Sequence, residues 1–206
     1  MFRLILALLL LAGPAMAATK TAILAGGCFW CVESDFESVP GVKSVVSGYT
    51  GGKTENPTYK QVSSGRTGHY EAVKITFDDR KVSYDMLLYF FFRSVNPTDA
   101  GGQFCDRGDT YRTAIFVQDA EQQRVAELAK KEAAQALGKK IVTPILPAST
   151  FWKAEDYHQD YYKGSNIVLT RAGPKKQSSA YKFYRAGCGR DKRVRELWGD
   201  KAAFAH

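Results

Sequence analysis

Residues 21–37 read TAILAGGCFWCVESDFE, which predicts a strand, a glycine turn and a helix in succession. The apolar run Thr21–Ala25 is typical of a short buried strand, and two glycines end it. The following residues, 29–37, predict a helix that begins directly after Cys28. Cys28 is therefore expected at a helix N-terminus, where unpaired backbone N–H groups and the helix dipole favour a thiolate over a thiol.

The rest of the chain continues to mix predicted strands and helices. Further strands are predicted at 42–49, 70–77 and 111–117, and helices at 83–93, at 119–137 and after Asn56-Pro57-Thr58. Asp119 is expected to cap the long helix, and Gly138 is expected to end it. This order of elements predicts a two-layer α/β sandwich.

The net charge is concentrated in one segment of the chain. The 206 residues include 29 Lys and Arg against 21 Asp and Glu, a formal net charge of +8. Residues 171–195 hold nine Lys or Arg and one Asp, so the remainder is neutral overall. Because this basic segment has no stacking platform or recognised binding motif, we predict no nucleic-acid partner. The length suits one ordinary domain or at most two small ones. We expect a catalytic α/β domain over residues 18–165 and an irregular basic tail over residues 166–206.

The first 17 residues have the three parts of a secretory signal peptide. Arg3 is basic, residues 4–12 are apolar, and Ala15-Met16-Ala17 supplies small residues, so we expect cleavage after Ala17. The apolar run is far shorter than the roughly 20 residues that a membrane-spanning helix needs. We therefore expect an exported protein without a membrane anchor, periplasmic in a bacterium, where the surroundings are oxidising.

The chain has four cysteines, Cys28, Cys31, Cys105 and Cys188. Two structural disulfides are one interpretation, although a domain of this size does not need them. A metal site is not predicted, because no second Cys pair or His pair has the spacing of zinc ligands. Val32 stands where the attachment of c-type haem would require His. The residues around Cys28 favour thiol chemistry instead.

One carboxylate shares the apolar face of a predicted strand. Alternation along residues 70–77 places Glu71 on the same side as Val73 and Ile75. Burial without a cation would raise the pKa of Glu71 and keep a proton available for general acid catalysis. The alternative is a solvated Glu71 at a frayed strand start. Tyr111 begins another strand in the same phase, where its hydroxyl either donates to a substrate oxygen or only packs.

Several motifs in the same order resemble the A-type peptide methionine sulfoxide reductases. The resemblance runs from about residue 22 to residue 162 and implies a ferredoxin-like core within the two-layer sandwich. It also implies reduction of the S-epimer of methionine sulfoxide, either free or within proteins. The matching strings are Gly27-Cys28-Phe29-Trp30-Cys31, Asn56-Pro57-Thr58-Tyr59, Ser64-Gly65-Arg66-Thr67-Gly68-His69-Tyr70-Glu71-Ala72-Val73, Asp106-Arg107-Gly108, Tyr111-Arg112 and Ala154-Glu155-Asp156-Tyr157-His158-Gln159-Asp160-Tyr161.

The resemblance also implies roles for individual residues. The nucleophile of the family falls on Cys28, its proton donor on Glu71, and its two oxygen-binding hydroxyls on Tyr59 and Tyr111. In the reaction that this implies, the Cys28 thiolate attacks the sulfoxide sulfur while Glu71 protonates the oxygen. Methionine leaves, and Cys28 remains as a sulfenic acid, which a second thiol converts to a disulfide.

Substrate binding and reductant are implied in the same way. Phe29 and Trp30 match the wall that receives the S-methyl group, and Asp106 matches a polar residue that orients the site. We expect no bound cofactor, since no dinucleotide-binding fingerprint is present. A thioredoxin-like dithiol is the expected external reductant. We also expect a monomer.

Two cysteines are candidates for the thiol that resolves the sulfenic acid. Cys31 lies one helical turn after Cys28 and is favoured by proximity. Cys188 lies in the expected flexible tail, from which other members of the family supply a recycling cysteine. Cys105 is interpreted as a packed free thiol, and His158 as a structural histidine. A general thiol-disulfide oxidoreductase that uses Cys28 and Cys31 directly is the competing interpretation.

Overall fold

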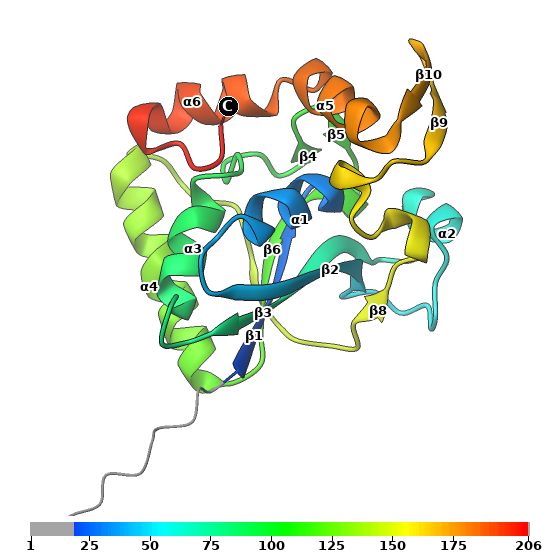
Figure 1. Ribbon diagram of the computed structural model, residues 1–206. Coiled ribbons are helices and arrows are strands. Elements are labelled where there is room, and N and C mark those ends of the chain that lie inside the picture. The colour runs from blue at the N-terminus through cyan, green and yellow to red at the C-terminus, as the bar shows by residue number, and fades with distance from the viewer. Residues whose placement is uncertain (1–18, 206) are drawn as a thin grey trace, which may run out of the picture.

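The computed structural model describes residues 19–205 (Figure 1). At its centre is a six-stranded sheet with the strand order β7-β6-β1-β3-β2-β8. Its strands are β1 (Thr19–Gly26), β2 (Val42–Thr50), β3 (Tyr70–Asp78), β6 (Thr113–Val117), β7 (Ile145–Pro147) and β8 (Trp152–Lys153). Two further pairs are β4 (Gly102–Gln103) with β5 (Asp106–Arg107), and β9 (Ile167–Thr170) with β10 (Gly173–Lys176). The α-helices are α1 (Phe29–Glu37), α2 (Tyr59–Ser63), α3 (Tyr84–Phe92), α4 (Ala120–Leu137), α5 (Gln177–Gly187) and α6 (Arg190–Trp198). Short 3-10 helices are Asp109–Tyr111, Asp156–His158, Tyr161–Lys163 and Gly199–Lys201.

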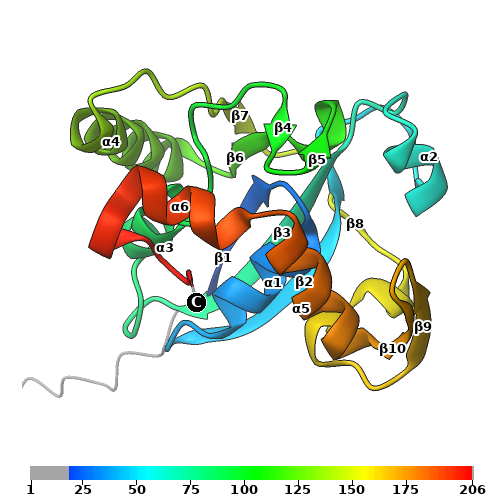
Figure 2. The same ribbon diagram turned by 90° about the horizontal axis from the view of Figure 1, so that it is seen from above.

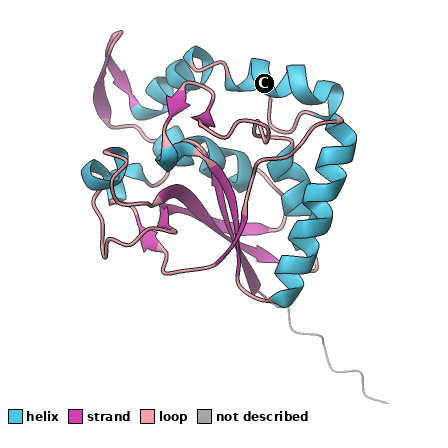
Figure 3. Cartoon of the chain, turned by 180° about the vertical axis from the view of Figure 1, so that it is seen from behind, coloured by secondary structure: helices cyan, strands magenta, loops and turns pink. Residues whose placement is uncertain are grey.

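The four central strands have the ferredoxin-like arrangement. β1 pairs antiparallel with both β3 and β6, and β2 pairs antiparallel with β3. Helix α1 connects β1 to β2, and α3 lies between β3 and β6 in the chain, which gives the split β-α-β order. β7 adds to the edge in parallel with β6 after α4, which runs along one side of the molecule (Figure 3). The predicted α/β sandwich with a ferredoxin-like core is confirmed.

The sheet buries its two faces differently. Leu24, Val73 and Ile75 belong to the main core, together with Phe36 of α1 and Phe91 of α3. Neighbouring residues of the same strands point to the other face, where a smaller cluster is covered by β7 and the segment that follows it. That cluster comprises Ile23, Ala25, Tyr70, Ala72, Ala114 and Phe116, against Leu146, Ala148 and Phe151. The helices thus lie over the face to which Glu71 was expected to point.

Local signals place several element boundaries correctly. The Asp119 side chain accepts a hydrogen bond from the backbone N–H of Gln122, and Gly138 ends α4 in a left-handed conformation. Thr58 forms a capping box at the start of α2, directly before Tyr59. The strand predicted at 111–117 instead begins at Thr113, and Tyr111 lies in a 3-10 helix.

The expectation of an irregular C-terminal tail is wrong. The segment forms the β9–β10 hairpin and helices α5 and α6; α5 lies beside α1, and α6 lies over α3 (Figure 2). Arg185 of α5 donates to Asp35 of α1 at 2.7 Å and also pairs with Asp191 at 2.8 Å. Arg190 of α6 donates to the carbonyl of Gly26 at 3.2 Å. Buried charge pairs and the apolar residues of α6 hold this segment on the core. The polar composition of the segment does not reveal these contacts.

The predicted signal peptide, residues 1–17, lies outside the described residues. Within residues 19–205, no helix combines the length and apolar character required to cross a membrane.

Removing Arg185 should destabilise the protein strongly. In Arg185→Ala the buried carboxylate of Asp35 loses its closest cation, so we expect the free energy of unfolding to fall by about 3 to 5 kcal/mol. Arg193→Ala is the matched control, because Arg193 and Glu196 form a partly exposed pair on the same C-terminal segment. That change should cost less than about 1 kcal/mol. Chemical denaturation followed by circular dichroism measures both, and equal losses would contradict the expectation.

Candidate active site

The predicted site residues meet in one cavity of about 640 Å³. Its walls come from the start of α1, from β3, from α2, from the β4–β5 region and from the C-terminal helices. Arg185, Arg190 and Phe104 also line it and were not among the predicted catalytic or substrate-binding residues. The predicted residues that line it are Cys28, Phe29, Trp30, Cys31, Tyr59, Glu71, Asp106, Tyr111 and Cys188.

A tight glycine turn sets the position of Cys28. Gly27 has a φ of +82°, and a Cβ at this position would lie 2.6 Å from the Cβ of Gln103. Any other residue would therefore be strained and would clash with the β4 strand. Cys28 follows as the N-cap of α1, and its carbonyl accepts the backbone N–H groups of Cys31 and Val32. Strand, turn and helix lie as the sequence predicts.

The two cysteines of α1 form a coupled thiol pair. The hydrogen bond between their sulfurs, burial, and the nearby carboxyl groups of Glu71 and Asp106 raise the pKa of Cys28. The same sulfur contact and the guanidinium groups of Arg190 and Arg185 lower the pKa of Cys31. The first negative charge of the pair is therefore favoured on Cys31. The position of Cys28 at a helix N-terminus does not by itself make it the more acidic thiol.

Glu71 lies on the helix-covered face of β3, as the strand alternation predicts. It is 2% exposed, and its Oε2 accepts the backbone N–H of Phe29 at 3.0 Å. Burial raises the pKa of Glu71 to about 8, with a further increase from Asp106, although the Phe29 N–H opposes this shift. The carboxyl group therefore holds a proton at neutral pH.

Two tyrosines complete the side of the cavity that holds Glu71. Tyr59 of α2 and Tyr111 of a 3-10 helix both line this cavity, and the two hydroxyls act on each other's pKa. Burial raises the pKa of Tyr59 to about 12 and raises that of Tyr111 as well. Burial also raises the pKa of Asp106. Both hydroxyls thus remain hydrogen-bond donors.

Glu155 is a supporting residue that the sequence analysis did not assign. Its carboxylate accepts the backbone N–H of Tyr59 at 2.8 Å and the hydroxyl of Tyr49 at 2.9 Å. It therefore fixes the start of α2, where Tyr59 lies. Glu155 belongs to the family motif around His158, and this membership is the sequence signal that could have identified it as a residue of the site.

Aromatic rings form another wall. Trp30 stacks on Tyr161 with ring centroids 3.7 Å apart, and Phe29 lies 6.5 Å from Tyr59. The indole N–H of Trp30 donates to Nδ1 of His158 at 3.2 Å. Burial lowers the pKa of His158 to about 4, so the ring is neutral and orients Trp30. His158 lies against the rings that line the cavity, and this agrees with the structural role predicted for it.

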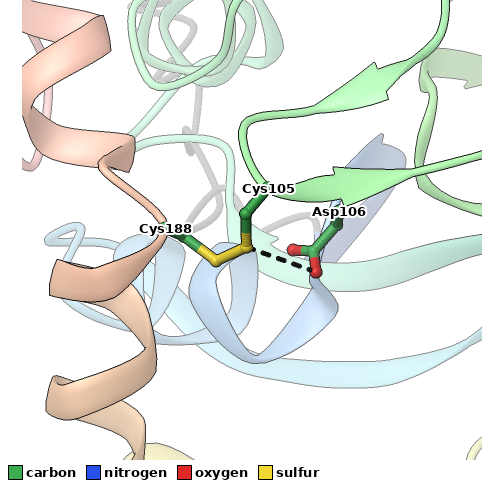
Figure 4. The surroundings of a disulfide bond; sticks show 3 residues. All are labelled: Cys105, Asp106 and Cys188. Atoms are coloured by element: carbon green, nitrogen blue, oxygen red, sulfur yellow. Dashed lines mark hydrogen bonds between the residues drawn. A yellow bond between two sulfur atoms is a disulfide. The ribbon is translucent and has the colours of Figure 1, made fainter.

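Cys105 and Cys188 form a disulfide, so the interpretation of Cys105 as a free thiol is wrong (Figure 4). Their Cα atoms are 4.9 Å apart, although 83 residues separate them in the chain. Cys105 is exposed, and Oδ1 of Asp106 lies 3.8 Å from its sulfur. The remaining cysteines, Cys28 and Cys31, are free. The spacing of the cysteines in the sequence does not predict this disulfide, because the disulfide depends on how the end of α5 is placed relative to the β4–β5 pair.

Two groups of described residues have donor atoms close enough for a metal ion. The first comprises Cys105, Asp106 and Cys188, but the two sulfurs are bonded to each other. A disulfide lacks the thiolates that metal ions bind. The second group comprises Glu33, Glu37 and Asp160. Glu33 and Glu37 are occupied by donors from Ser47, the Asp160 backbone, Tyr162 and Lys163. Neither group carries the features of a dedicated metal site.

Comparisons with known proteins give one consistent result. The model of the family described as peptide methionine sulfoxide reductase matches residues 20–202. A peptide methionine sulfoxide reductase MsrA 2 of Caulobacter vibrioides is 50% identical over 202 residues, which cover 97% of this chain and 96% of that protein.

Solved structures show the same similarity. Mxr1 of Saccharomyces cerevisiae in reduced form is 29% identical with a TM-score of 0.68, over 70% of this chain and 84% of that chain. Methionine sulfoxide reductase A of Corynebacterium diphtheriae is 32% identical with a TM-score of 0.64, over 74% and 76%. Mxr1 has also been solved in complex with Trx2, at 22% identity and a TM-score of 0.51, over 68% and 84%, which concerns the fold alone.

Proposed function

Because this chain belongs to the peptide methionine sulfoxide reductase family, we propose that it reduces the S-epimer of methionine sulfoxide with Cys28 as its nucleophile. The chain is a thiol-dependent oxidoreductase that reduces methionine sulfoxide. The observation that supports the residue assignment is the convergence of Cys28, protonated Glu71 and two tyrosine hydroxyls in one cavity. The substrate is free methionine sulfoxide or oxidised methionine in proteins.

The first chemical step oxidises Cys28 and reduces the substrate sulfur. The Cys28 sulfur attacks the sulfoxide sulfur as a thiolate, and Glu71 protonates the sulfoxide oxygen. A bond forms between the two sulfurs, the sulfur–oxygen bond breaks, and the protonated oxygen leaves as water. Water then attacks the Cys28 sulfur, the bond between the two sulfurs breaks, methionine leaves, and Cys28 keeps the hydroxyl group as a sulfenic acid. The substrate sulfur gains two electrons, and Cys28 loses two.

The other walls hold the substrate for this step. Tyr59 and Tyr111 donate hydrogen bonds to the sulfoxide oxygen, which becomes more basic as the bond breaks. Phe29 and Trp30 provide the apolar surface for the S-methyl group. Asp106 lies near Cys28 and Glu71 and raises the pKa of both, so it keeps protons on this side of the cavity.

Cys31 resolves the sulfenic acid in this proposal. Its thiolate displaces hydroxide from the Cys28 sulfur, a proton converts the hydroxide to water, and a Cys28–Cys31 disulfide forms. The hydrogen bond between the two sulfurs and the guanidinium groups near Cys31 support this assignment. Cys188 is already bonded to Cys105.

An external dithiol must then return two electrons. We assign this role to a thioredoxin-like protein, because thiol–disulfide exchange needs no bound cofactor. The complex of yeast Mxr1 with Trx2 supports this class of partner. We also propose that the chain is exported to the periplasm after cleavage behind Ala17. Purification from a periplasmic fraction with Ala18 as the mature N-terminus would support export, and an intact N-terminus in the cytoplasm would contradict it.

The decisive assay measures methionine release from each sulfoxide epimer. With dithiothreitol, the mature protein should turn over the S-epimer only, and Cys28→Ser should reduce turnover to background. Insulin-disulfide reduction is measured in parallel as the control for general thiol-disulfide exchange. Insulin reduction without sulfoxide turnover would refute the proposal and favour a general oxidoreductase.

Glu71→Gln should lower kcat/KM by about 100-fold to 10,000-fold, because it removes the proton donor while keeping an acceptor for the Phe29 N–H. The pKa of Glu71 is raised to about 8, so the acid form is populated below that pH and lost above it. Activity should therefore fall above about pH 8 in the parent protein, and Glu71→Gln should lack this decline. The exposed Glu121→Gln is the control. Unchanged kcat/KM in Glu71→Gln would exclude Glu71 as the acid.

A further inference from the structure

The β9–β10 hairpin, which projects beside α5, turns an apolar face to the solvent (Figure 1). Ile167 and Leu169 of β9 are 66% and 85% exposed, and they are the two most exposed large apolar side chains in the described part of the chain. Val168, between them, points to the opposite face and packs against the cluster that contains Tyr161 and Tyr181. One face of the hairpin is therefore fixed on the body of the molecule, and the other is uncovered.

The backbone of β9 also has a free edge. Among the strands of residues 19–205, β9 pairs with β10 and with no other. Bonded and non-bonded pairs alternate along an antiparallel ladder, and the hydrogen bond from the backbone N–H of Gln177 to the carbonyl of Asn166 fixes the alternation here. The backbone N–H and C=O groups of Ile167 and Leu169 therefore point away from β10. Pro174 lies opposite Leu169 and agrees with this, because proline has no N–H to donate to its partner.

This hairpin borders the catalytic cavity. Leu169 and Arg171 line the cavity that holds Cys28, and Tyr184 of α5 lies in the same wall. An extended chain beside β9 thus runs along the rim of the cavity, from which one of its side chains can enter toward Cys28. A second copy of the protein paired at this edge would instead cover the opening. The position of the hairpin therefore favours a chain that carries the reacting group.

The hairpin is basic as well as apolar. Residues 167–176 include Arg171, Lys175 and Lys176 and contain no Asp or Glu. The Lys175 ammonium lies 5.7 Å from the centre of the Phe183 ring, while Arg171 and Lys176 are exposed. Exposed opposite charges attract each other, and salt screens the attraction. Acidic residues in a bound chain therefore complement this surface.

We propose that β9 binds the protein segment that carries the oxidised methionine, as an added strand in extended conformation, with a preference for acidic residues beside the methionine. This rests on the proposed function. Main-chain hydrogen bonds do not depend on the sequence of the added strand, which suits an enzyme that acts on methionines in different proteins. Ile167 and Leu169 add apolar contacts with alternate side chains of the segment. The preferred substrates are then extended segments of proteins, ahead of free methionine sulfoxide.

The test compares a peptide with the free amino acid. The probes are free methionine S-sulfoxide and a peptide of about ten residues, long enough to cover β9, with one methionine S-sulfoxide among Glu, Thr and Val. With dithiothreitol as reductant, the parent protein should have the higher kcat/KM for the peptide. In Ile167→Thr/Leu169→Thr the ratio of the two kcat/KM values should fall about tenfold, mainly through the KM of the peptide. Threonine keeps the strand propensity and loses most of the apolar contact.

Leu128→Gln is the matched control. Leu128 is also an exposed apolar residue, but it lies on α4 and does not line the cavity. This change should leave the ratio as it is in the parent protein. An equal fall of the ratio in the control would refute a specific role of the hairpin.

Two series of altered peptides give independent results from the parent protein. N-methylation of one backbone amide at a time should raise KM at every second position, because alternate N–H groups of an added strand point to its neighbour. Replacement of the Glu residues by Lys should also raise KM, and added salt should reduce this difference. Uniform sensitivity to N-methylation, or none, would refute the added strand.

Other outcomes assign the surface differently. An equal fall of kcat/KM for both substrates in the double variant would show that the hairpin only supports the cavity. A fall found with thioredoxin but not with dithiothreitol would assign the surface to the reductant, and a dimer that the variant loses in light scattering would assign it to a second copy. Each of these results would refute the proposal.

Failure of this inference is distinguishable from failure of the proposed function. Turnover of free methionine S-sulfoxide without a preference for the peptide would refute the docking of a segment on β9 and leave the reductase function intact. No turnover of either substrate by the parent protein would refute the reductase function itself. If the double variant does not fold, the two peptide series in the parent protein decide between these results.

Discussion

The hydrogen bond from the backbone N–H of Phe29 to the buried carboxyl group of Glu71 connects the two parts of the site. It joins the first turn of α1 to the helix-covered face of β3, and it places Cys28 beside the proton donor. It also uses one of the few unpaired N–H groups at the helix N-terminus, which are the groups that would otherwise stabilise a thiolate. The same contact that brings the acid to the nucleophile therefore reduces what the helix can do for the Cys28 charge. The stabilisation of a thiolate comes from elsewhere in the fold.

That stabilisation comes from the basic C-terminal segment. The high proportion of charged residues in this segment predicts a solvated tail, but the side chains of Arg185 and Arg190 are only 8% and 2% exposed. Both guanidinium groups pair with the carboxylate of Asp35 in α1, and Arg190 also donates a hydrogen bond to the carbonyl of Gly26 at the end of β1. The two guanidinium groups hold the C-terminal helices on the core and lower the pKa of Cys31. Folding and thiol chemistry thus depend on the same buried charges.

Local sequence signals predict the parts of the site that depend on neighbouring residues. The strand, glycine turn and helix around Cys28, the face of Glu71 and the cap of α4 all follow from periodicity and short-range chemistry. Such local signals do not predict contacts between residues that are far apart in the sequence. Asp35 and Arg185 are 150 positions apart and Cys105 and Cys188 are 83 apart, so neither pairing follows from spacing. Tyr111 is predicted in a strand because it alternates in phase with the apolar residues of β6. The backbone instead forms a 3-10 helix at Tyr111, before β6 begins.

The cavity has to satisfy two opposing electrostatic requirements. The sulfoxide oxygen needs a protonated carboxyl group, which burial and nearby negative charge favour, whereas a reactive sulfur needs positive charge that favours the thiolate. A single uniform environment would satisfy one requirement at the expense of the other. Here Glu71 and Asp106 act on the Cys28 side of the first turn of α1, and Arg185 and Arg190 act on the Cys31 side. A proton that leaves Cys28 as it attacks has a thiolate acceptor in Cys31, because the guanidinium groups favour the negative charge there before the attack begins. The separation of charge across one helical turn lets proton donation and thiolate chemistry operate in the same cavity.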